Sequence, residues 1–393
     1  MKYLTLALTA LMLLIASGLA PADKTVTAPA TATGIPADEL SPASLPVRGL
    51  AIEASKPAGL DAFLKFIEED LVPAGFNMLI LRVDWNYAYE SHPELRDPNP
   101  LTRNDVKRIV ALCQRSGIRL VPQINLLGHQ SWANQTYALL REYPQFDETP
   151  SIKTEEHYAP WPNDYGLYCK SYCPLHPEVH DVVFPLIDEL CDAFEADAFH
   201  AGMDEVFYIG MDECPRCKGH DKSELFAGEV TCIHDHLAEK GRQLMIWGDR
   251  LLDGRTTGLG EWEASYNDTW RAIDMIPKDV FICDWHYERA DLTGVYFATK
   301  GFPVAECGYR NPDICLQQIR DMVNFRKQAS PEMAEHLQGY IHTIWSGADM
   351  FLRRYNALKA GQDPAVSSRR PYDPKRDDVR ALMEVMAAFA GQK

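Results

Sequence analysis

From residue 47 onward, the chain alternates short apolar runs with longer amphipathic stretches. Short apolar runs bounded by polar or glycine-containing segments are typical of buried strands. The pattern therefore predicts eight strands. We expect them at 47–53, 76–83, 118–125, 197–203, 243–248, 279–285, 302–307 and 338–345.

The segments between these strands have the apolar spacing of helices, and some carry helix start signals. Thr102 stands three residues before Asp105, and Ser330-Pro331 precedes a further short helix. We expect the main helices at 59–72, 102–116, 177–195, 222–240, 268–276, 289–299 and 312–329, with a last helix near 376–391.

Eight strands separated by helices favour parallel βαβ units, and eight such strands close a (β/α)8 TIM barrel. We expect one catalytic domain of this α/β class over residues 47–393. A doubly wound open sheet is the alternative. No G-x-G-x-x-G motif follows the first strand, so a dinucleotide fold has no positive support.

The first 46 residues have a different composition. Lys2 and the short apolar run at 4–15, followed by Ala-Pro-Ala at 20–22, predict a signal peptide over residues 1–22. Residues 23–46 are rich in Ala, Pro and Thr and predict a flexible linker. We therefore expect a bacterial protein that is exported to the periplasm or secreted, without stable membrane insertion after signal removal.

Composition and charge narrow the range of partners. The chain has 393 residues, of which 46% are hydrophobic, and a formal net charge of −17. That apolar content supports a sizeable core, whereas the negative charge would repel a phosphate backbone. Nucleic acid is therefore not an expected partner.

Polar and aromatic residues gather where the predicted strands end. In a barrel these ends share one face, where active sites lie. Long loops follow the third strand (126–176) and the fourth (204–221). The strand-end residues are Asp84, Trp85, Asn125, His129, Asp204, Glu205, Trp247, Asp249, Trp285, Tyr287, Glu306 and Trp345.

Asp204 and Glu205 are adjacent acids at the end of the fourth strand. Two neighbouring carboxyls at such a position favour one protonated and one ionised group. Cleavage of a glycosidic bond needs both a proton donor and a negative charge. A solvated acidic turn or a divalent-metal site would also explain the pair.

Several sequence blocks, in their order, resemble glycoside hydrolase family 20, the β-N-acetylhexosaminidases. The central block, His200-x-Gly202-x-Asp204-Glu205, is similar to the family's His-x-Gly-Gly-Asp-Glu motif. The resemblance extends over about residues 47–350. The other blocks are Arg48-Gly49-Leu50, Asp84, Val121-Pro122-Gln123-Ile124-Asn125, Gly128-His129, Cys173-Pro174-x-x-Pro177-Glu178-Val179, Met245-Ile246-Trp247, Trp285-x-Tyr287 and Ile344-Trp345.

The resemblance implies an enzyme that removes terminal N-acetylglucosamine or N-acetylgalactosamine from a glycan or glycoconjugate by a retaining, substrate-assisted mechanism. Asp204 would orient the acetamido group and Glu205 would be the general acid and base, with no cofactor for catalysis. The expected substrate-binding residues are Arg48, Asp84, His129, His200, Trp247, Trp285, Tyr287 and Trp345. For His129 and His200 a structural role, and for each Trp ordinary core packing, are the alternatives.

Some positions depart from the family pattern. Gln123 and Asn125 are neutral where the family usually has acids, and Ser346-Gly347 follows Trp345 where the family commonly has Trp-x-Glu. These changes leave the acid pair intact but affect contacts to the sugar hydroxyls. A carbohydrate-binding barrel with weak or lost catalysis is therefore an alternative function. A metal-dependent hydrolase using His129, His200 and Asp84 is another.

Four of the ten cysteines form two close pairs in the long loops, Cys169 with Cys173 and Cys214 with Cys217. This spacing suits a structural four-thiolate zinc site. An oxidising compartment favours one or two disulfides instead. The cysteines at positions 113, 191, 283, 307 and 315 are expected to be buried thiols.

Overall fold

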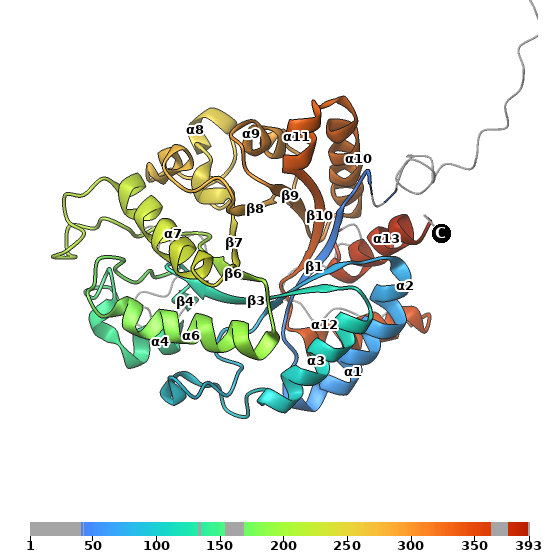
Figure 1. Cartoon of the computed structure of the whole chain (residues 1–393), viewed down its shortest axis with the longest axis horizontal. Coiled ribbons are helices and arrows are strands. Elements are labelled where there is room, and N and C mark those ends of the chain that lie inside the picture. Colours follow the sequence, from blue (N-terminus) through green and yellow to red (C-terminus); the bar gives the residue numbers. More distant parts are fainter. Residues whose placement is uncertain (1–40, 42, 133–134, 154–168, 363–375, 392–393) are drawn as a thin grey trace, which may run out of the picture.

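A computed structural model describes residue 41 and residues 43–132, 135–153, 169–362 and 376–391. Eight parallel strands close into a barrel, and helices surround it (Figure 1). The predicted (β/α)8 TIM barrel and all eight predicted strands are confirmed. In barrel order the strands are β1 (Val47–Glu53), β10 (Leu337–Ile344), β9 (Val304–Gly308), β8 (Phe281–Trp285), β7 (Gln243–Trp247), β6 (Ala198–Gly202), β3 (Arg119–Leu126) and β2 (Met78–Arg82).

The barrel closes because the first and last strands pair. Six residue pairs join β1 and β10 in parallel register, from Val47↔Gly339 to Ile52↔Ile344. On its other edge, β1 pairs with β2. No open strand edge remains among the eight described strands, which removes the unpaired backbone groups that an open sheet would expose.

Helices of different lengths cover the outside of the barrel. The helix α3 begins as predicted, since Thr102 and Asp105 form a reciprocal capping box. The larger helices are α1 (Leu60–Phe66), α3 (Arg103–Arg115), α6 (Val179–Phe194), α7 (Lys222–Ala238), α9 (Thr293–Thr299), α10 (Pro312–Gln328), α12 (Ala348–Lys359) and α13 (Asp378–Ala390). Shorter ones are α2 (Val72–Ala74), α4 (Ala138–Glu142), α8 (Gly254–Thr257) and α11 (Pro331–His336).

The structure differs from the predicted helices in a few places. The first predicted helix, 59–72, consists of three consecutive segments. These are α1, a five-residue π-helical segment (Ile67–Leu71) and α2, and the last one ends at Gly75, whose φ is +92°. The segment Thr269–Asp274 is a 3-10 helix. The helix α12 was not predicted. It packs against α1, where Phe351 lies 5.6 Å from Phe66 between ring centroids.

Two apolar cores follow from the alternation of side chains along each strand. Side chains that point inward fill the barrel, among them Ala51, Ile80, Val121 and Met245. Those that point outward, such as Leu50 and Leu79, pack beneath the helices. The inner positions lie two residues apart, so the last inward residue of each strand lines the barrel mouth.

No helix among the described residues is long and apolar enough to cross a bilayer. The predicted signal peptide, residues 1–22, and most of the predicted linker, 23–46, lie outside the described residues. The predicted loops after β3 and β6 are present. The first contains α4 and a two-stranded ribbon, β4 (Ser131–Trp132) with β5 (Gln135–Thr136).

Candidate active site

The adjacent acids Asp204 and Glu205 lie immediately after β6, at the carboxyl end of the barrel. The backbone turns sharply there, because Gly202, Met203 and Glu205 all have positive φ angles, from +51° to +68°. A non-glycine residue rarely adopts this conformation, and such strain concentrates at functional sites. A Cβ atom on Gly202 would lie 2.7 Å from Oδ1 of Asn125, so only glycine fits there.

His129, in the loop after β3, brings the two acids together. Its Nε2 atom lies 3.1 Å from Oδ2 of Asp204 and 3.2 Å from Oε2 of Glu205. His129 also has a positive φ, +53°. Its ring is stacked on Trp132 of the β-ribbon, with centroids 5.8 Å apart. The imidazole therefore faces both carboxyls from one side, and substrate binding by His129 stays a prediction.

The two acids differ in ionisation. Burial and the negative charges of Asp204 and Asp249 together raise the pKa of Glu205 to about 7, although His129 acts to lower it. Burial also acts to raise the pKa of Asp204, but the charge of His129 and its hydrogen bond hold that pKa below the usual value. Near neutral pH, Asp204 is therefore ionised while a substantial fraction of Glu205 is protonated.

One carboxylate oxygen of Asp204 is free to bind a ligand. Oδ2 faces His129, whereas Oδ1 is buried and has no hydrogen-bonding partner among the described residues. A buried unpartnered carboxylate oxygen is costly. A donor on a bound molecule would satisfy it.

Asp249, after β7, supports this turn from the neighbouring strand. Its Oδ2 accepts hydrogen bonds from the backbone nitrogen of Glu205 at 2.9 Å and from Nε of Arg250 at 2.6 Å. Its Oδ1 accepts from Nε1 of Trp285 at 3.2 Å. Both side chains of the Asp249–Arg250 ion pair are fully buried. Asp249 therefore fixes the backbone of Glu205, a role that the sequence left undecided.

The predicted aromatic residues gather at the mouth. Trp247 lies 5.5 Å from Trp345, and Trp285 lies 5.0 Å from Tyr287, between ring centroids. Nε1 of Trp345 donates to the hydroxyl oxygen of Tyr287 at 2.6 Å. All four rings pack on the apolar interior of the barrel. Trp247 and Trp345 also line a small cavity at the mouth, and substrate binding by the four rings stays a prediction.

The prediction that Arg48 binds sugar is wrong. Arg48 is the second residue of β1, at the opposite end of the barrel. Its Nε donates to the carbonyl of Gly75 at 2.7 Å and its Nη1 to the carbonyl of Leu45 at 3.2 Å. The guanidinium thus braces the bottom of the barrel and cannot reach the mouth.

A different arginine, Arg82, lies at the mouth. Its guanidinium pairs with Glu53 at 2.6 Å and with Asp84 at 3.4 Å, and lies over the ring of Trp345 at 5.6 Å. A small cavity of about 10 Å³, which has room for about one water molecule, opens between Arg82, Glu53 and the rings of Trp247 and Trp345. Arg82 and Glu53 were not predicted, although each is the last inward residue of its strand.

Asp84 lies at the end of β2 as predicted. Its Oδ1 accepts from the backbone nitrogen of Asn125 at 2.8 Å, and Asp84 has a φ of +44°. Burial raises its pKa against the opposing charge of Arg82. Asp84 therefore links Arg82 to the loop that carries His129.

His200 occupies a supporting position rather than the predicted substrate-binding one. The side chain is fully buried inside the barrel, and Nδ1 accepts from the backbone nitrogen of Gly202 at 3.0 Å. Its ring packs on Trp247 at 4.6 Å. The packing alternative for His200 is therefore the correct one. Glu306 likewise lies away from the acids, buried beside Gly294 of α9 on the outside of β9.

The cysteines are arranged differently from the prediction. All ten have free thiols, so the expected disulfides are absent. The predicted four-cysteine group is also wrong in one member. Cys173, Cys214 and Cys217 come together with Glu148, whereas Cys169 lies 3.3 Å from Nδ1 of His129. The five cysteines predicted as buried thiols are buried.

Cys169 is part of the acid site. Its thiol donates to Oε2 of Glu205 at 3.6 Å. His129, Cys169 and Glu205 lie close enough to form a metal-ligating group. Among the described residues, the groups with metal-ligand geometry do not contain His200 or Asp84, so the predicted His129, His200 and Asp84 set is not assembled.

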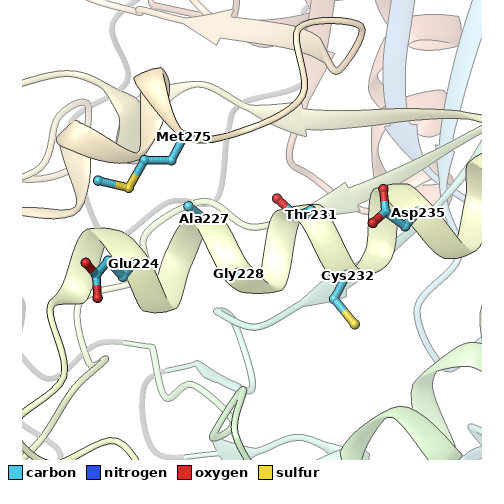
Figure 2. A pocket seen from close by; sticks show the side chains of 7 residues that line it. All are labelled: Glu224, Ala227, Gly228, Thr231, Cys232, Asp235 and Met275. Atoms are coloured by element: carbon cyan, nitrogen blue, oxygen red, sulfur yellow. The ribbon is translucent and has the colours of Figure 1, made fainter.

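A second hollow lies far from this chemistry. It is open to solvent and runs along α7, with Met275 over the same side of the helix as Ala227 (Figure 2). Glu224 and Asp235 lie at its two ends, and none of its lining residues is one of the mouth residues described above.

The arrangement at the mouth supplies an acid with a pKa near neutrality, a neighbouring carboxylate and aromatic walls. Such a set can protonate a leaving oxygen and stabilise a developing positive charge.

Comparison with known proteins gives a consistent result. The profile of the glycosyl hydrolase family 20 catalytic domain matches residues 85–346. A lacto-N-biosidase of Bifidobacterium bifidum is 24% identical over 214 residues, which are 51% of this chain and 17% of that protein. A beta-hexosaminidase of Akkermansia muciniphila is 27% identical over 192 residues, 44% of this chain and 37% of that protein. The chain thus spans well under half the length of these two relatives.

Solved structures share the fold. The crystal structure of a beta-N-acetylhexosaminidase from Bacteroides fragilis superposes with a TM-score of 0.57 at 16% identity, covering 89% of this chain and 66% of that one. At this identity the likeness concerns the fold alone.

Proposed function

The chain belongs to glycosyl hydrolase family 20, and we propose that it removes terminal β-linked N-acetylglucosamine or N-acetylgalactosamine from a glycan or glycoconjugate. The observation that carries this proposal is the placement of Asp204 and Glu205 at the barrel mouth, where both carboxyls lie within 3.2 Å of Nε2 of His129. The similarity to the beta-hexosaminidase of Akkermansia muciniphila supports this substrate class.

In the proposed reaction Glu205 is the general acid. Its proton passes to the glycosidic oxygen as the bond to the anomeric carbon breaks. The oxygen of the substrate's own acetamido group forms the new bond to that carbon, giving an oxazolinium-like intermediate. Glu205, now ionised, then accepts a proton from the water that opens this intermediate with net retention.

Asp204 has a different proposed role. Its buried Oδ1 atom would accept a hydrogen bond from the acetamido nitrogen and stabilise the positive charge of the intermediate. Tyr287 would complete this pocket. Its hydroxyl oxygen accepts from Nε1 of Trp345, which leaves its hydrogen for the acetamido oxygen. The rings of Trp247, Trp285 and Trp345 would enclose the methyl group.

Recognition of the distal hydroxyls is proposed to differ from the family pattern. Gly347 stands where the family commonly has an acid. The hydroxyl of the preceding residue, Ser346, donates to Asp378 at 2.8 Å. The cavity beside Trp345 instead contains the Glu53–Arg82 pair. A carboxylate and a forked guanidinium both suit sugar hydroxyls. We assign these contacts to Glu53 and Arg82 in place of Arg48.

A chromogenic β-N-acetylglucosaminide tests the proposal directly. The purified chain should release the chromophore with retention, seen by NMR as a β-anomeric first product. Glu205→Gln should lower kcat by about 100- to 10,000-fold. Asp204→Asn should lower it by about 100- to 1,000-fold. An unchanged rate in Asp204→Asn would contradict the assisted mechanism.

The same assay separates the alternatives. Binding of the sugar without turnover would instead support a carbohydrate-binding barrel. Loss of turnover after chelation, with the fold intact by circular dichroism, would instead support a metal-dependent hydrolase.

A thiazoline analogue of the intermediate should inhibit strongly if the acetamido pocket is present.

We also propose export to the periplasm or the medium. This proposal rests on the apolar run at 4–15 and the small residues at 20–22. N-terminal sequencing of the mature protein should begin at Asp23. A mature chain that retains Met1 and stays in the cytoplasm would contradict it.

A further inference from the structure

Three thiols and one carboxylate form a compact buried cluster that the proposed catalysis does not use. Sγ of Cys173 lies 3.3 Å from Sγ of Cys217 and 3.4 Å from Sγ of Cys214. A carboxylate oxygen of Glu148 joins them, and all four ligand atoms lie within 4.8 Å of one another. All four residues are buried.

These separations fit the ligands of a tetrahedral metal ion. With zinc–sulfur bonds of about 2.3 Å, the ligands of a tetrahedron are about 3.8 Å apart. The two sulfur–sulfur distances from Cys173, 3.3 and 3.4 Å, are slightly shorter than this, and no two ligand atoms are more than 4.8 Å apart. Cys214 and Cys217 also have the Cys-x-x-Cys spacing of structural zinc sites.

The surroundings of the cluster point to a missing positive charge. Oε1 of Glu148 accepts from the backbone nitrogen of Met211 at 2.9 Å. Oε2 is buried and has no hydrogen-bonding partner among the described residues. A buried carboxylate oxygen normally has a partner, because leaving it without one costs free energy. A cation within the cluster would be that partner.

We propose that Glu148, Cys173, Cys214 and Cys217 bind one structural zinc ion. The three thiols release their protons to solvent on binding, and the carboxylate supplies the fourth ligand. This coordination leaves no open position, as is typical of structural rather than catalytic sites. Cys169 is not a ligand of this ion.

A disulfide explains the cluster less well. The thiol of Cys173 contacts both other thiols, so oxidation of either pair would leave the third thiol buried beside the carboxylate of Glu148. A metal ion uses all four groups at once. Coordinated thiolates are also less available for oxidation.

The ion would connect the two loops that build the active site. Glu148 and Cys173 belong to the loop after β3, and Cys214 and Cys217 to the loop after β6. Cys173 follows Cys169, which contacts Glu205, by four residues. Metal loss should therefore loosen the geometry around Glu205 without removing a catalytic group.

Metal analysis of the full chain, purified without chelator, tests the proposal without any substrate. We expect about one zinc ion per chain, with three sulfurs at about 2.3 Å and one oxygen at about 2.0–2.2 Å by X-ray absorption. The double variant Cys214→Ser/Cys217→Ser should lose at least about nine-tenths of the zinc. The matched variant Cys113→Ser/Cys315→Ser, which changes two buried thiols elsewhere, should retain it.

The wild-type chain provides the check if the double variant does not fold. After exchange into cobalt, intense thiolate-to-cobalt charge-transfer bands should appear. A metal-free chain whose mass is lower by two hydrogens would overturn the proposal in favour of a disulfide. Zinc that persists in the folded double variant, or cobalt without thiolate bands, would also overturn it. None of these readouts depends on glycosidase activity.

Discussion

Nε2 of His129 lies 3.1 Å from Oδ2 of Asp204. Burial alone would lower the pKa of His129, but the charge of Asp204 and the adjacent Cys169 raise it well above the usual value. The imidazolium in turn keeps Asp204 ionised. One ion pair thus fixes the charge of the assisting carboxylate, and leaves Glu205 as the group that titrates near neutrality.

The first prediction concerns the pH dependence of kcat/KM. Glu205 must be protonated to act as an acid, so activity should fall as the pH rises through about 7, its pKa. Asp204 must be ionised, and its pKa lies below the usual value of 3.8, so the acid limb should lie below that pH. Initial rates of chromogenic hydrolysis across this range, with the fold monitored at each pH, measure both limbs. A basic limb that lies near pH 4.5 would show that Glu205 has an ordinary pKa.

The second prediction concerns His129→Gln. His129 lowers the pKa of both acids, by charge and by hydrogen bonding. Its removal should therefore move both limbs of the pH profile to higher pH, in addition to lowering the maximal rate. The control is Trp132→Phe, which keeps an aromatic ring beside His129 and should leave the limbs in place. If the limbs of His129→Gln stayed where they are, the ion pair would have no role in setting the pKa values.

The third prediction concerns the stability contributed by Asp249. Asp249→Ala would leave the fully buried guanidinium of Arg250 without its carboxylate partner. We expect the free energy of unfolding to fall by about 3–5 kcal/mol, because an unpaired buried charge is costly. Urea unfolding measures this change.

An exposed ion pair provides the control for that measurement. Arg255 and Asp268 are more than half exposed in their side chains. Arg255→Ala should therefore change the stability by less than about 1 kcal/mol. Equal losses in the two variants would show that burial of the Asp249–Arg250 pair does not matter.

The fourth prediction concerns Tyr287→Phe. The phenylalanine ring keeps the packing on Trp285 but removes the hydroxyl that accepts from Trp345 at 2.6 Å. Loss of one hydrogen bond of about 0.5–1.5 kcal/mol to the acetamido group corresponds to a decrease in kcat/KM of up to about tenfold. Steady-state kinetics with the N-acetyl substrate, and inhibition by the thiazoline analogue, should show parallel losses. If Tyr287→Phe weakened thiazoline binding but left hydrolysis unchanged, the hydroxyl would have no role in the reaction.

Much of the fold could be predicted because it depends on neighbouring residues in the sequence. The period of two in β2 placed Met78, Ile80 and Arg82 on one face, and the Thr102 capping box began a helix where expected. The helix α12 was missed, although Ala348, Phe351, Leu352 and Tyr355 have helical apolar spacing.

The errors at the site arose from contacts between distant segments. Arg48 and Arg82 both belong to barrel strands, but only their positions along those strands decide which one lies at the mouth. Cys169 and Cys173 are close in sequence, yet one contacts His129 and the other joins Glu148 in the thiol cluster.

The sequence by itself determined the eight alternating strand and helix segments and the adjacent acids at the end of the fourth strand, because side-chain periodicity and local spacing are carried by near neighbours. Only the tertiary structure decided that Glu205 titrates near neutral pH while Asp204 is ionised. That difference depends on burial and on His129, which folding brings from the loop after a different strand. Electrostatic free energies depend on distance and desolvation, and both are set only when the barrel closes.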